Sequence, residues 1–302
     1  MSIPGGLSGV INVYKEKGYT SHDVVAIIRK ILKTKKVGHT GTLDPQAQGV
    51  LPVCVGRATK IASLITSEGK SYRAELILGI TTDTGDITGT ITNKIDEVNI
   101  TEQKIREALN FFTGGYMQVP PMYSAVKVKG KKLYELARNG QTAERPARFV
   151  KISNITPGTF DGSKITMDID CGKGTYIRSL CEDIGKRLGC GGCMGGLERT
   201  KSGVFTADKA MKLEEVEEAA KKNNFDFIIP IDRAFYAPAV ETSVKSVLSG
   251  NPVKESNISA SKKLEENKRY WLYCDKTLIG LHIFVNGTLK PEIMLYENHK
   301  KD

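Results

Sequence analysis

The stretch Gly38-His39-Thr40-Gly41-Thr42-Leu43-Asp44-Pro45 holds the residue choices on which the interpretation of this chain depends. Its glycines permit close backbone approach, and Pro45 biases Asp44 toward an extended conformation. The run suits neither a helix nor a long strand, so it predicts a stiff loop that presents one carboxylate. A turn cluster whose Asp and Thr side chains only cap backbone groups would have the same composition.

The composition predicts a globular protein with a polyanionic partner. A chain of 302 residues is long enough for two domains, and its 40% hydrophobic content argues against disorder. The net charge of +10 favours nucleic acid, because Lys and Arg side chains that neutralise phosphates release counterions. No secretory signal or membrane span is evident, so we expect a cytoplasmic location.

More than half of the excess charge lies in one segment, residues 120–151. Eight basic and two acidic residues give this segment a net charge of +6. Tyr123 and Tyr134 interleave with the cations, and nucleic-acid surfaces use this mixture for phosphate contact and base stacking. The alternative is a solvated helix face that buries Leu133, Leu136 and Ala137.

The cysteine pattern does not favour a metal site. Cys190-Gly191-Gly192-Cys193 has the spacing of two metal ligands, but a structural zinc needs four, and no second CxxC or HxxxH occurs. We interpret this stretch as a flexible glycine-rich loop. The six cysteines are scattered in a chain without an export signal, so we expect reduced thiols.

Hydrophobic periodicity predicts helices and strands in alternation. Thr20 and Asp23 resemble a capping box at the start of a helix that continues to Leu32. Further strands are expected at Tyr72–Leu78, Ile87–Thr92 and Ile165–Cys171, and further helices at Thr101–Phe112, Ser179–Leu188 and Leu213–Lys222.

The character of the chain changes after Pro230 and Pro238. Short strands are expected at Tyr270–Cys274, Leu278–Phe284 and Ile293–Tyr296. We therefore place a domain boundary near Ala237, which separates residues 1–236 from residues 237–302.

The segment Lys173-Gly174-Thr175-Tyr176-Ile177-Arg178 offers a cation that could orient the carboxylate of Asp44. Its last four residues read as extended, and residues two apart on a strand share a face, so we expect Tyr176 and Arg178 to point the same way. If that face meets Asp44, Arg178 favours the ionised carboxylate. A surface strand with an unrelated arginine has the same spacing. Tyr72 could supply an aromatic platform or a phenol, although a half-buried strand tyrosine is the commoner case.

Five segments, in this order, resemble the TruB family of tRNA pseudouridine-55 synthases, which isomerise the T-loop uridine of tRNA. The similarity spans about residues 8 to 210. The segments are the Gly38–Pro45 run with Gly49-Val50-Leu51-Pro52, Lys70-Ser71-Tyr72-Arg73, Thr82-Asp83-Thr84, Pro120-Pro121-Met122-Tyr123-Ser124-Ala125-Val126-Lys127, and Gly172-Lys173-Gly174-Thr175-Tyr176-Ile177-Arg178.

The resemblance implies a set of roles at one site. Asp44 would be the essential catalytic residue and Arg178 its ion-pair partner. Tyr72 would stack on the flipped uracil and help to remove the C5 proton. The reaction implies no metal or organic cofactor, and Asp44 could act as nucleophile at C1′ or as base toward the C2′ proton. The resemblance also implies that Tyr176 and Leu197 line the substrate pocket. It implies that His39 takes the place of the extruded base, although a loop histidine bound by backbone is the alternative.

The implied fold is mixed α/β (α+β), with a largely antiparallel central sheet in residues 1–236. Residues 120–151 correspond to an insertion that clamps the T-arm of tRNA. Residues 237–302 resemble a small β-rich RNA-binding domain of the PUA type, or form a β appendage that only packs on the catalytic part. The implied partner is tRNA, and no obligate protein partner or membrane is indicated.

Some features leave other interpretations open. The family often has Leu-Arg-Arg-Thr where this chain has Leu197-Glu198-Arg199-Thr200, so an anion replaces one cation. A related ribosomal-RNA synthase works in a guide-RNA particle, but the 120–151 insertion and the absence of a long Lys-rich tail argue against it. A non-catalytic RNA-folding module would bind tRNA without isomerisation.

Overall fold

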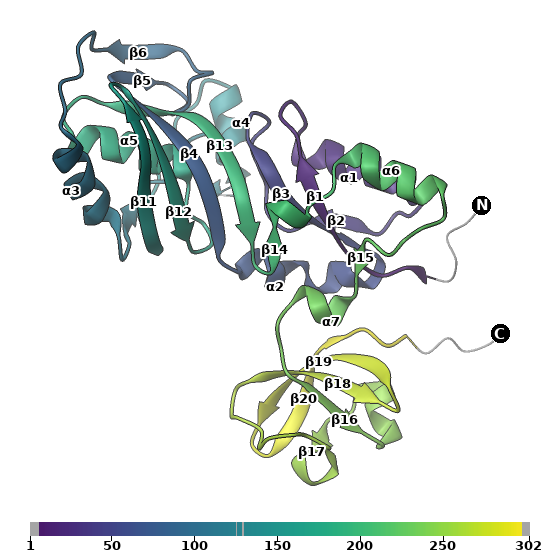
Figure 1. Ribbon diagram of the computed structural model, residues 1–302. Coiled ribbons are helices and arrows are strands. Elements are labelled where there is room, and N and C mark those ends of the chain that lie inside the picture. Colours follow the sequence, from purple (N-terminus) through teal and green to yellow (C-terminus); the bar gives the residue numbers. More distant parts are fainter. Residues whose placement is uncertain (1–5, 125, 129, 298–302) are drawn as a thin grey trace.

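Two sheets organise the computed structural model, which describes residues 6–124, 126–128 and 130–297 (Figure 1). The large sheet has the order β11-β12-β4-β13-β3-β1-β15, and β14 and β2 pair at β13 and β3. Among the described strand pairs of this large sheet, only the pairing of β13 with β3 is parallel. The prediction of an α+β fold with a largely antiparallel central sheet is therefore confirmed. Its strands are β1 Gly9–Lys15, β2 Val37–His39, β3 Gln48–Val55, β4 Lys70–Leu78, β11 Ile152–Asp161, β12 Lys164–Cys171, β13 Gly192–Ser202, β14 Phe205–Thr206 and β15 Ile228–Ile229.

Helices cover one face of this sheet. Helices α3 (Glu102–Phe112) and α5 (Ile177–Arg187) lie behind one half, and α1 (Ser21–Ile31) and α6 (Leu213–Lys221) behind the other (Figure 1). Alternation in β4 buries Tyr72, Ala74 and Leu76 under the helices and leaves Arg73 exposed. The short elements are α2 Ala62–Ser67, α4 Leu133–Arg138, α7 Ile231–Ala234, β5 Ile80–Thr82, β6 Ile91–Lys94, β7 Tyr116–Gln118, β8 Lys127–Val128, β9 Lys131–Lys132 and β10 Arg148–Val150.

The local signals for the long elements are confirmed. Thr20 and Asp23 form the predicted capping box of α1, and Thr101 caps α3. The strand expected at Ile87–Thr92 begins only at Ile91, because the side chain of Asp86 accepts hydrogen bonds from the Thr88 backbone and hydroxyl and closes a turn. Strand β6 begins only after that turn.

The glycine-rich stretch after Cys190 is not a loop, contrary to the sequence interpretation. Gly192 begins β13, the central strand of the large sheet, and both Cys190 and Cys193 are buried. A Cβ on Gly185 would lie 2.3 Å from the carbonyl carbon of Gly191, so these glycines let α5 cross the strand at close range. Within the described residues, no group of His, Cys, Asp or Glu side chains is arranged to hold a metal ion.

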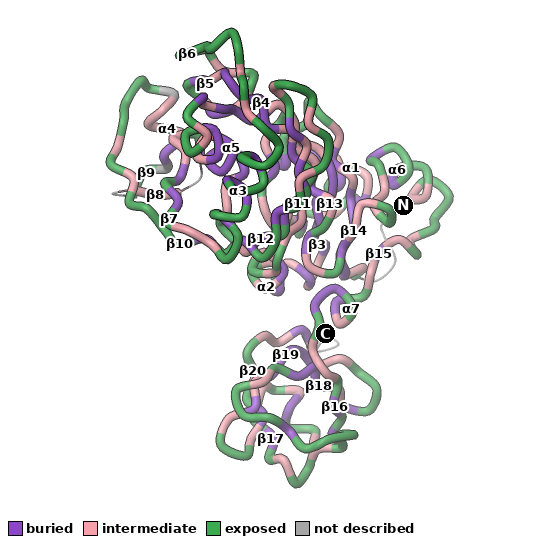
Figure 2. The backbone as a smooth tube through the Cα atoms, turned by 60° about the vertical axis from the view of Figure 1, so that its left-hand side comes forward, coloured by how far each residue is buried: buried purple, intermediate pink, exposed green. Residues whose placement is uncertain are grey.

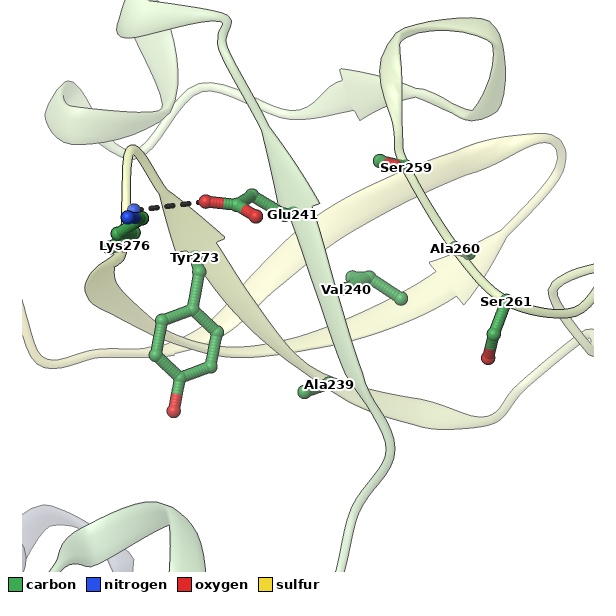
Figure 3. A pocket seen from close by; sticks show the side chains of 8 residues that line it. All are labelled: Ala239, Val240, Glu241, Ser259, Ala260, Ser261, Tyr273 and Lys276. Atoms are coloured by element: carbon green, nitrogen blue, oxygen red, sulfur yellow. Dashed lines mark hydrogen bonds between the residues drawn. The ribbon is translucent and has the colours of Figure 1, made fainter.

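Residues 239–294 form a five-stranded sheet in the order β16-β18-β19-β20-β17. It has its own buried cluster, and Figure 2 shows buried residues in both sheets. A shallow cavity of about 470 Å³ lies beside its edge strand, where the Lys276 backbone donates to Glu241 (Figure 3). The strands are β16 Ala239–Thr242, β17 Val253–Lys254, β18 Arg269–Cys274, β19 Thr277–Val285 and β20 Thr288–Met294.

The small sheet packs tightly against the rest of the chain. Trp271 and Leu281 of this sheet share a buried cluster with Ile61 and Ile65 near α2. The indole nitrogen of Trp271 donates to the carbonyl of Phe235 at 3.1 Å. This shared core fixes how the small sheet sits on the large one. Across the described part of the chain, no helix has the length and apolar composition that a membrane crossing requires.

We expect Trp271→Ala to lower the free energy of unfolding by about 3–5 kcal/mol, the range for truncating a buried Trp. The Trp271 side chain is 1% exposed and packs edge-to-face on Phe235. Urea unfolding checks this, with Tyr236→Ala as the control, because Tyr236 is 84% exposed. Equal midpoints for the two variants would show that the shared cluster does not stabilise the molecule.

A second stability prediction concerns His282, which is fully buried in β19 between Tyr270 and Pro291. Burial lowers the pKa of His282 to about 4 from an ordinary value of 6.5. As the pH falls below 6.5, His282 becomes protonated in the unfolded chain, whereas in the folded chain it stays neutral until about pH 4. We therefore expect stability to fall over this window by up to about 3 kcal/mol. Urea midpoints at pH 7 and pH 4.5 measure the fall, and it should be smaller in His282→Leu.

Candidate active site

The Asp44 loop is held by its backbone and leaves the carboxylate accessible. Leu43 is buried, and its amide donates a hydrogen bond to Ser21 Oγ at 2.9 Å. The amide of Ala47 donates to the carbonyl of Asp44 at 3.0 Å. The Asp44 side chain itself is 40% exposed. The loop therefore presents a carboxylate at a fixed position, open to a bound molecule.

Arg178 contacts the Asp44 carboxylate through two of its guanidinium nitrogens. Its Nε lies 3.0 Å from Asp44 Oδ2, and its Nη2 lies 3.4 Å from Asp44 Oδ1. The Arg178 side chain is only 7% exposed. A two-point contact from a buried, planar guanidinium fixes the orientation of the carboxylate as well as attracting its charge.

Arg178 reaches Asp44 from a helix, so the prediction that it shares a strand face with Tyr176 is wrong. Gly174 turns the chain with a φ of +82°, and α5 begins at Ile177. The side chain of Gln118 accepts from the Tyr176 amide at 2.8 Å and donates to its carbonyl at 3.0 Å. These contacts hold the half-buried Tyr176 at the start of the helix, tied to Gln118.

The remaining donors of Arg178 bind residues for which the sequence indicated no such role. Nη2 donates to the carbonyl of Tyr123 at 2.8 Å, and Nη1 donates to that of Thr84 at 3.1 Å. Asp86 Oδ2 lies 3.9 Å from Nη1. Thr84 and Tyr123 lie in two of the segments that carry the family resemblance, but neither was assigned a contact with Arg178. Arg178 thus links Asp44, the β5–β6 turn and the start of the basic segment.

Tyr72 and Leu197 lie on the core face of the sheet. Tyr72 is 8% exposed, and burial raises the pKa of its phenol. Leu197 is opposite Ala74 in the β13–β4 register and packs against the main core. Glu198, which stands where the family often has an arginine, is opposite the exposed Arg73 in the same register. Its carboxylate therefore faces the other side of the sheet. There it accepts a 2.9 Å hydrogen bond from the hydroxyl of Tyr14.

Two buried cations beneath the loop were missed by the sequence analysis. Lys15 Nζ donates to the carbonyls of Tyr19 at 2.8 Å and Pro45 at 3.2 Å. Burial lowers the pKa of Lys15 to about 8, and the charge of Asp44 opposes that shift. Arg199, 1% exposed, donates to the carbonyl of Gly41 at 3.1 Å. One cation holds each end of the stretch that carries Asp44.

His39 is bound by backbone at its ring nitrogen. The amide of Gly41 donates to His39 Nδ1 at 3.3 Å, and the ring meets His22 edge-on at 5.5 Å. Burial, with smaller contributions from His22 and Arg199, lowers the pKa of His39. The Nδ1 contact assigns the proton of a neutral ring to Nε2. The half-buried ring is therefore neutral and oriented.

The arrangement supports chemistry at a single carboxylate. An accessible, oriented carboxylate can attack an electrophilic carbon or remove a proton, and a phenol nearby can exchange a proton. The C-terminal cavity is lined by none of these residues.

Comparison with known proteins finds similarity over most of the chain. A family model described as the TruB family pseudouridylate synthase N-terminal domain matches residues 29–177. A second, described as the tRNA pseudouridylate synthase B C-terminal domain, matches residues 178–236. The chain is 46% identical to the tRNA pseudouridine synthase B of Alkaliphilus oremlandii, over 93% of this chain and 94% of the relative. It is 45% identical to that of Clostridium tetani, over 91% and 95%.

Two solved structures are similar to this chain over most of its length. A chain of a Cbf5-Nop10-Gar1 complex is 28% identical, with a TM-score of 0.74 over 95% of this chain and 84% of that one. A chain of an H/ACA RNP bound to a substrate RNA containing 2′-deoxyuridine is 25% identical, also with a TM-score of 0.74, over 96% and 86%.

Proposed function

We propose, from the premise that this chain belongs to the TruB family of pseudouridylate synthases, that it isomerises the T-loop uridine of tRNA, uridine-55. The protein is an isomerase that forms pseudouridine in tRNA, in line with its curated relatives. The T-loop target, the roles of single residues and the mechanism are the proposal. The observation that carries it is the two-point contact between buried Arg178 and accessible Asp44.

The reaction breaks the N1–C1′ bond of uridine and forms a C5–C1′ bond. The C5 proton leaves and N1 takes up a proton, so the product has the composition of the substrate. Asp44 acts on the ribose, either as nucleophile at C1′ or as base toward the C2′ proton. Arg178 keeps the carboxylate oriented through both bond changes. These steps require no redox partner, metal or organic cofactor.

A uridine in a folded T-loop reaches Asp44 only when it leaves the base stack. Tyr72 stacks on the extruded uracil and takes part in removing the C5 proton. Tyr176 and Leu197 line the same pocket. His39, neutral and backbone-bound, occupies the space that the base leaves.

The basic segment, residues 120–151, clamps the T-arm. Tyr123 is 39% exposed while its carbonyl binds Arg178, so the segment that contacts RNA begins at the catalytic pair. Exposed Lys131 and Arg148 supply phosphate contacts farther along it.

We further propose a division into a catalytic domain, residues 1–236, and a PUA-like RNA-binding domain, residues 237–302. The second family model ends at residue 236, and the five-stranded sheet begins at Ala239. A tRNA-modifying enzyme of this kind works in the cytoplasm, where tRNA matures.

Incubation with an unmodified tRNA transcript tests the function. Pseudouridine is mapped by carbodiimide-dependent primer-extension stops. We expect one new stop, at the T-loop uridine. Stops at other uridines, or none in the presence of bound tRNA, would reject the assigned target or the assigned reaction.

A further inference from the structure

Arg199 is a fully buried cation that forms no ion pair with a carboxylate in the described part of the chain. Its Nε donates to the carbonyl of Val50 at 2.6 Å, and its Nη2 donates to that of Gly41 at 3.1 Å. Burying a charge in this way costs free energy that a well-packed apolar side chain would not. A position that needed only volume would not favour arginine.

The position of Arg199 gives its charge a target. Strand β13 is opposite β4 with Arg199 in register with Tyr72, and it meets β3 with Arg199 in register with Gly49. A Cβ on Gly49 would lie 2.3 Å from the carbonyl oxygen of Arg199, so the two strands approach too closely there for a side chain. Arg199 thus lies where β13 joins β3 to β4, and its side chain shares a sheet face with that of its cross-strand neighbour Tyr72.

Arg199 opposes the effect of burial on Tyr72. Burial raises the pKa of the phenol, and the charge of Arg199 is the largest influence that lowers it. Asp44 and Cys171 act in the same direction as burial. Without Arg199, a phenol in this place would hold its proton much more firmly.

We propose that Arg199 is a positioning residue of uridine isomerisation, which holds the Tyr72 oxygen beside a permanent positive charge so that it can accept the C5 proton. This inference rests on the proposed function. After the C5–C1′ bond has formed, the C5–H bond breaks and its electron pair restores the C5=C6 double bond. For this step the Tyr72 hydroxyl first releases its own proton to solvent, and the phenolate oxygen, stabilised by the charge of Arg199, then takes the C5 proton and becomes a phenol again. N1, which left C1′ with its electron pair, takes a proton from solvent.

The test compares single-turnover rates on two tRNA transcripts, one made with ordinary uridine and one with uridine deuterated at C5. We expect Arg199→Met to lower the rate about 10²–10³-fold, as for loss of one preorganised donor, with little change in the tRNA Kd. Because C5 deprotonation becomes the slow step, the rate ratio between the two transcripts should rise above that of the wild type.

Lys15→Met is the matched control, because it removes the other buried cation beneath the same loop but not one beside Tyr72. We expect it to lower the melting temperature without raising the C5 isotope effect. In a Tyr72→Phe background, Arg199→Met should cost almost no further rate, since the oxygen on which it acts is gone.

An unchanged isotope effect in folded Arg199→Met, or equal losses in both backgrounds, would overturn the inference. If Arg199→Met does not fold, Arg199→Lys is tested instead. A lysine ammonium cannot bind the carbonyls of Val50 and Gly41 and also keep its charge beside Tyr72, so a raised C5 isotope effect is again expected. A C5 isotope effect equal to that of the wild type would overturn the inference. Wild-type protein that binds tRNA and forms no pseudouridine would reject the proposed function instead.

Discussion

Asp44→Ala and Asp44→Asn are expected to abolish pseudouridine formation, with single-turnover rates lowered more than about 10⁴-fold, the scale for loss of a catalytic nucleophile or base. The Asn variant is the sharper of the two, because it keeps the shape of the side chain and removes only its charge and nucleophilicity. The loop should persist in both variants, since it is held by backbone groups such as Thr40 N, which donates to the carbonyl of Pro52 at 3.1 Å.

Binding and catalysis should separate in these variants. The tRNA Kd is expected to stay close to that of the wild type, because the basic segment supplies most phosphate contacts. Asp168→Asn is the control: Asp168 is an exposed aspartate paired with Arg73 on the opposite sheet face, and its loss should leave the rate unchanged. Turnover by Asp44→Asn at the Asp168→Asn rate would remove Asp44 from the chemistry.

The second large effect is expected for Arg178→Lys, with a rate loss of about 10²–10³-fold, comparable to removing a preorganised charge-stabilising donor. A lysine ammonium is a point charge and cannot serve both oxygens of Asp44 together with the carbonyls of Thr84 and Tyr123. Loss of these hydrogen bonds from a charged donor costs about 1.5–3 kcal/mol each, so the melting temperature should fall as well.

Arg73→Lys is the matched control for this prediction. Arg73 also binds a carboxylate, with its Nε 3.0 Å from Asp168 Oδ1, but its side chain is 61% exposed. Water compensates a lost contact at such a site, and we expect neither rate nor stability to change measurably. Equal rates for Arg178→Lys and the wild type would show that the planar fork is not needed.

Several parts of the fold follow from short-range information. The capping box at Thr20, the cap at Thr101 and the alternation in residues 72–78 predicted elements that the structure contains, because each depends on neighbours within a few residues. The errors arose where a distant contact overrides local preference. Residues 175–178 look extended, yet Gln118 holds Tyr176 so that α5 begins at Ile177.

The features of the candidate active site also separate into those set by local sequence and those set by distant contacts. That Asp44 lies in a stiff loop could be predicted from local sequence, because Pro45 restricts the backbone of Asp44 and Gly41 permits a φ of +124° that other residues rarely adopt. The three-dimensional fold was needed to show that Arg178, 134 positions away, binds it, and that Lys15 and Arg199 lie buried beneath it. In a sequence, a buried cation looks like an exposed one. The difference is which carbonyls and phenols surround it, and strand pairing between distant segments sets that.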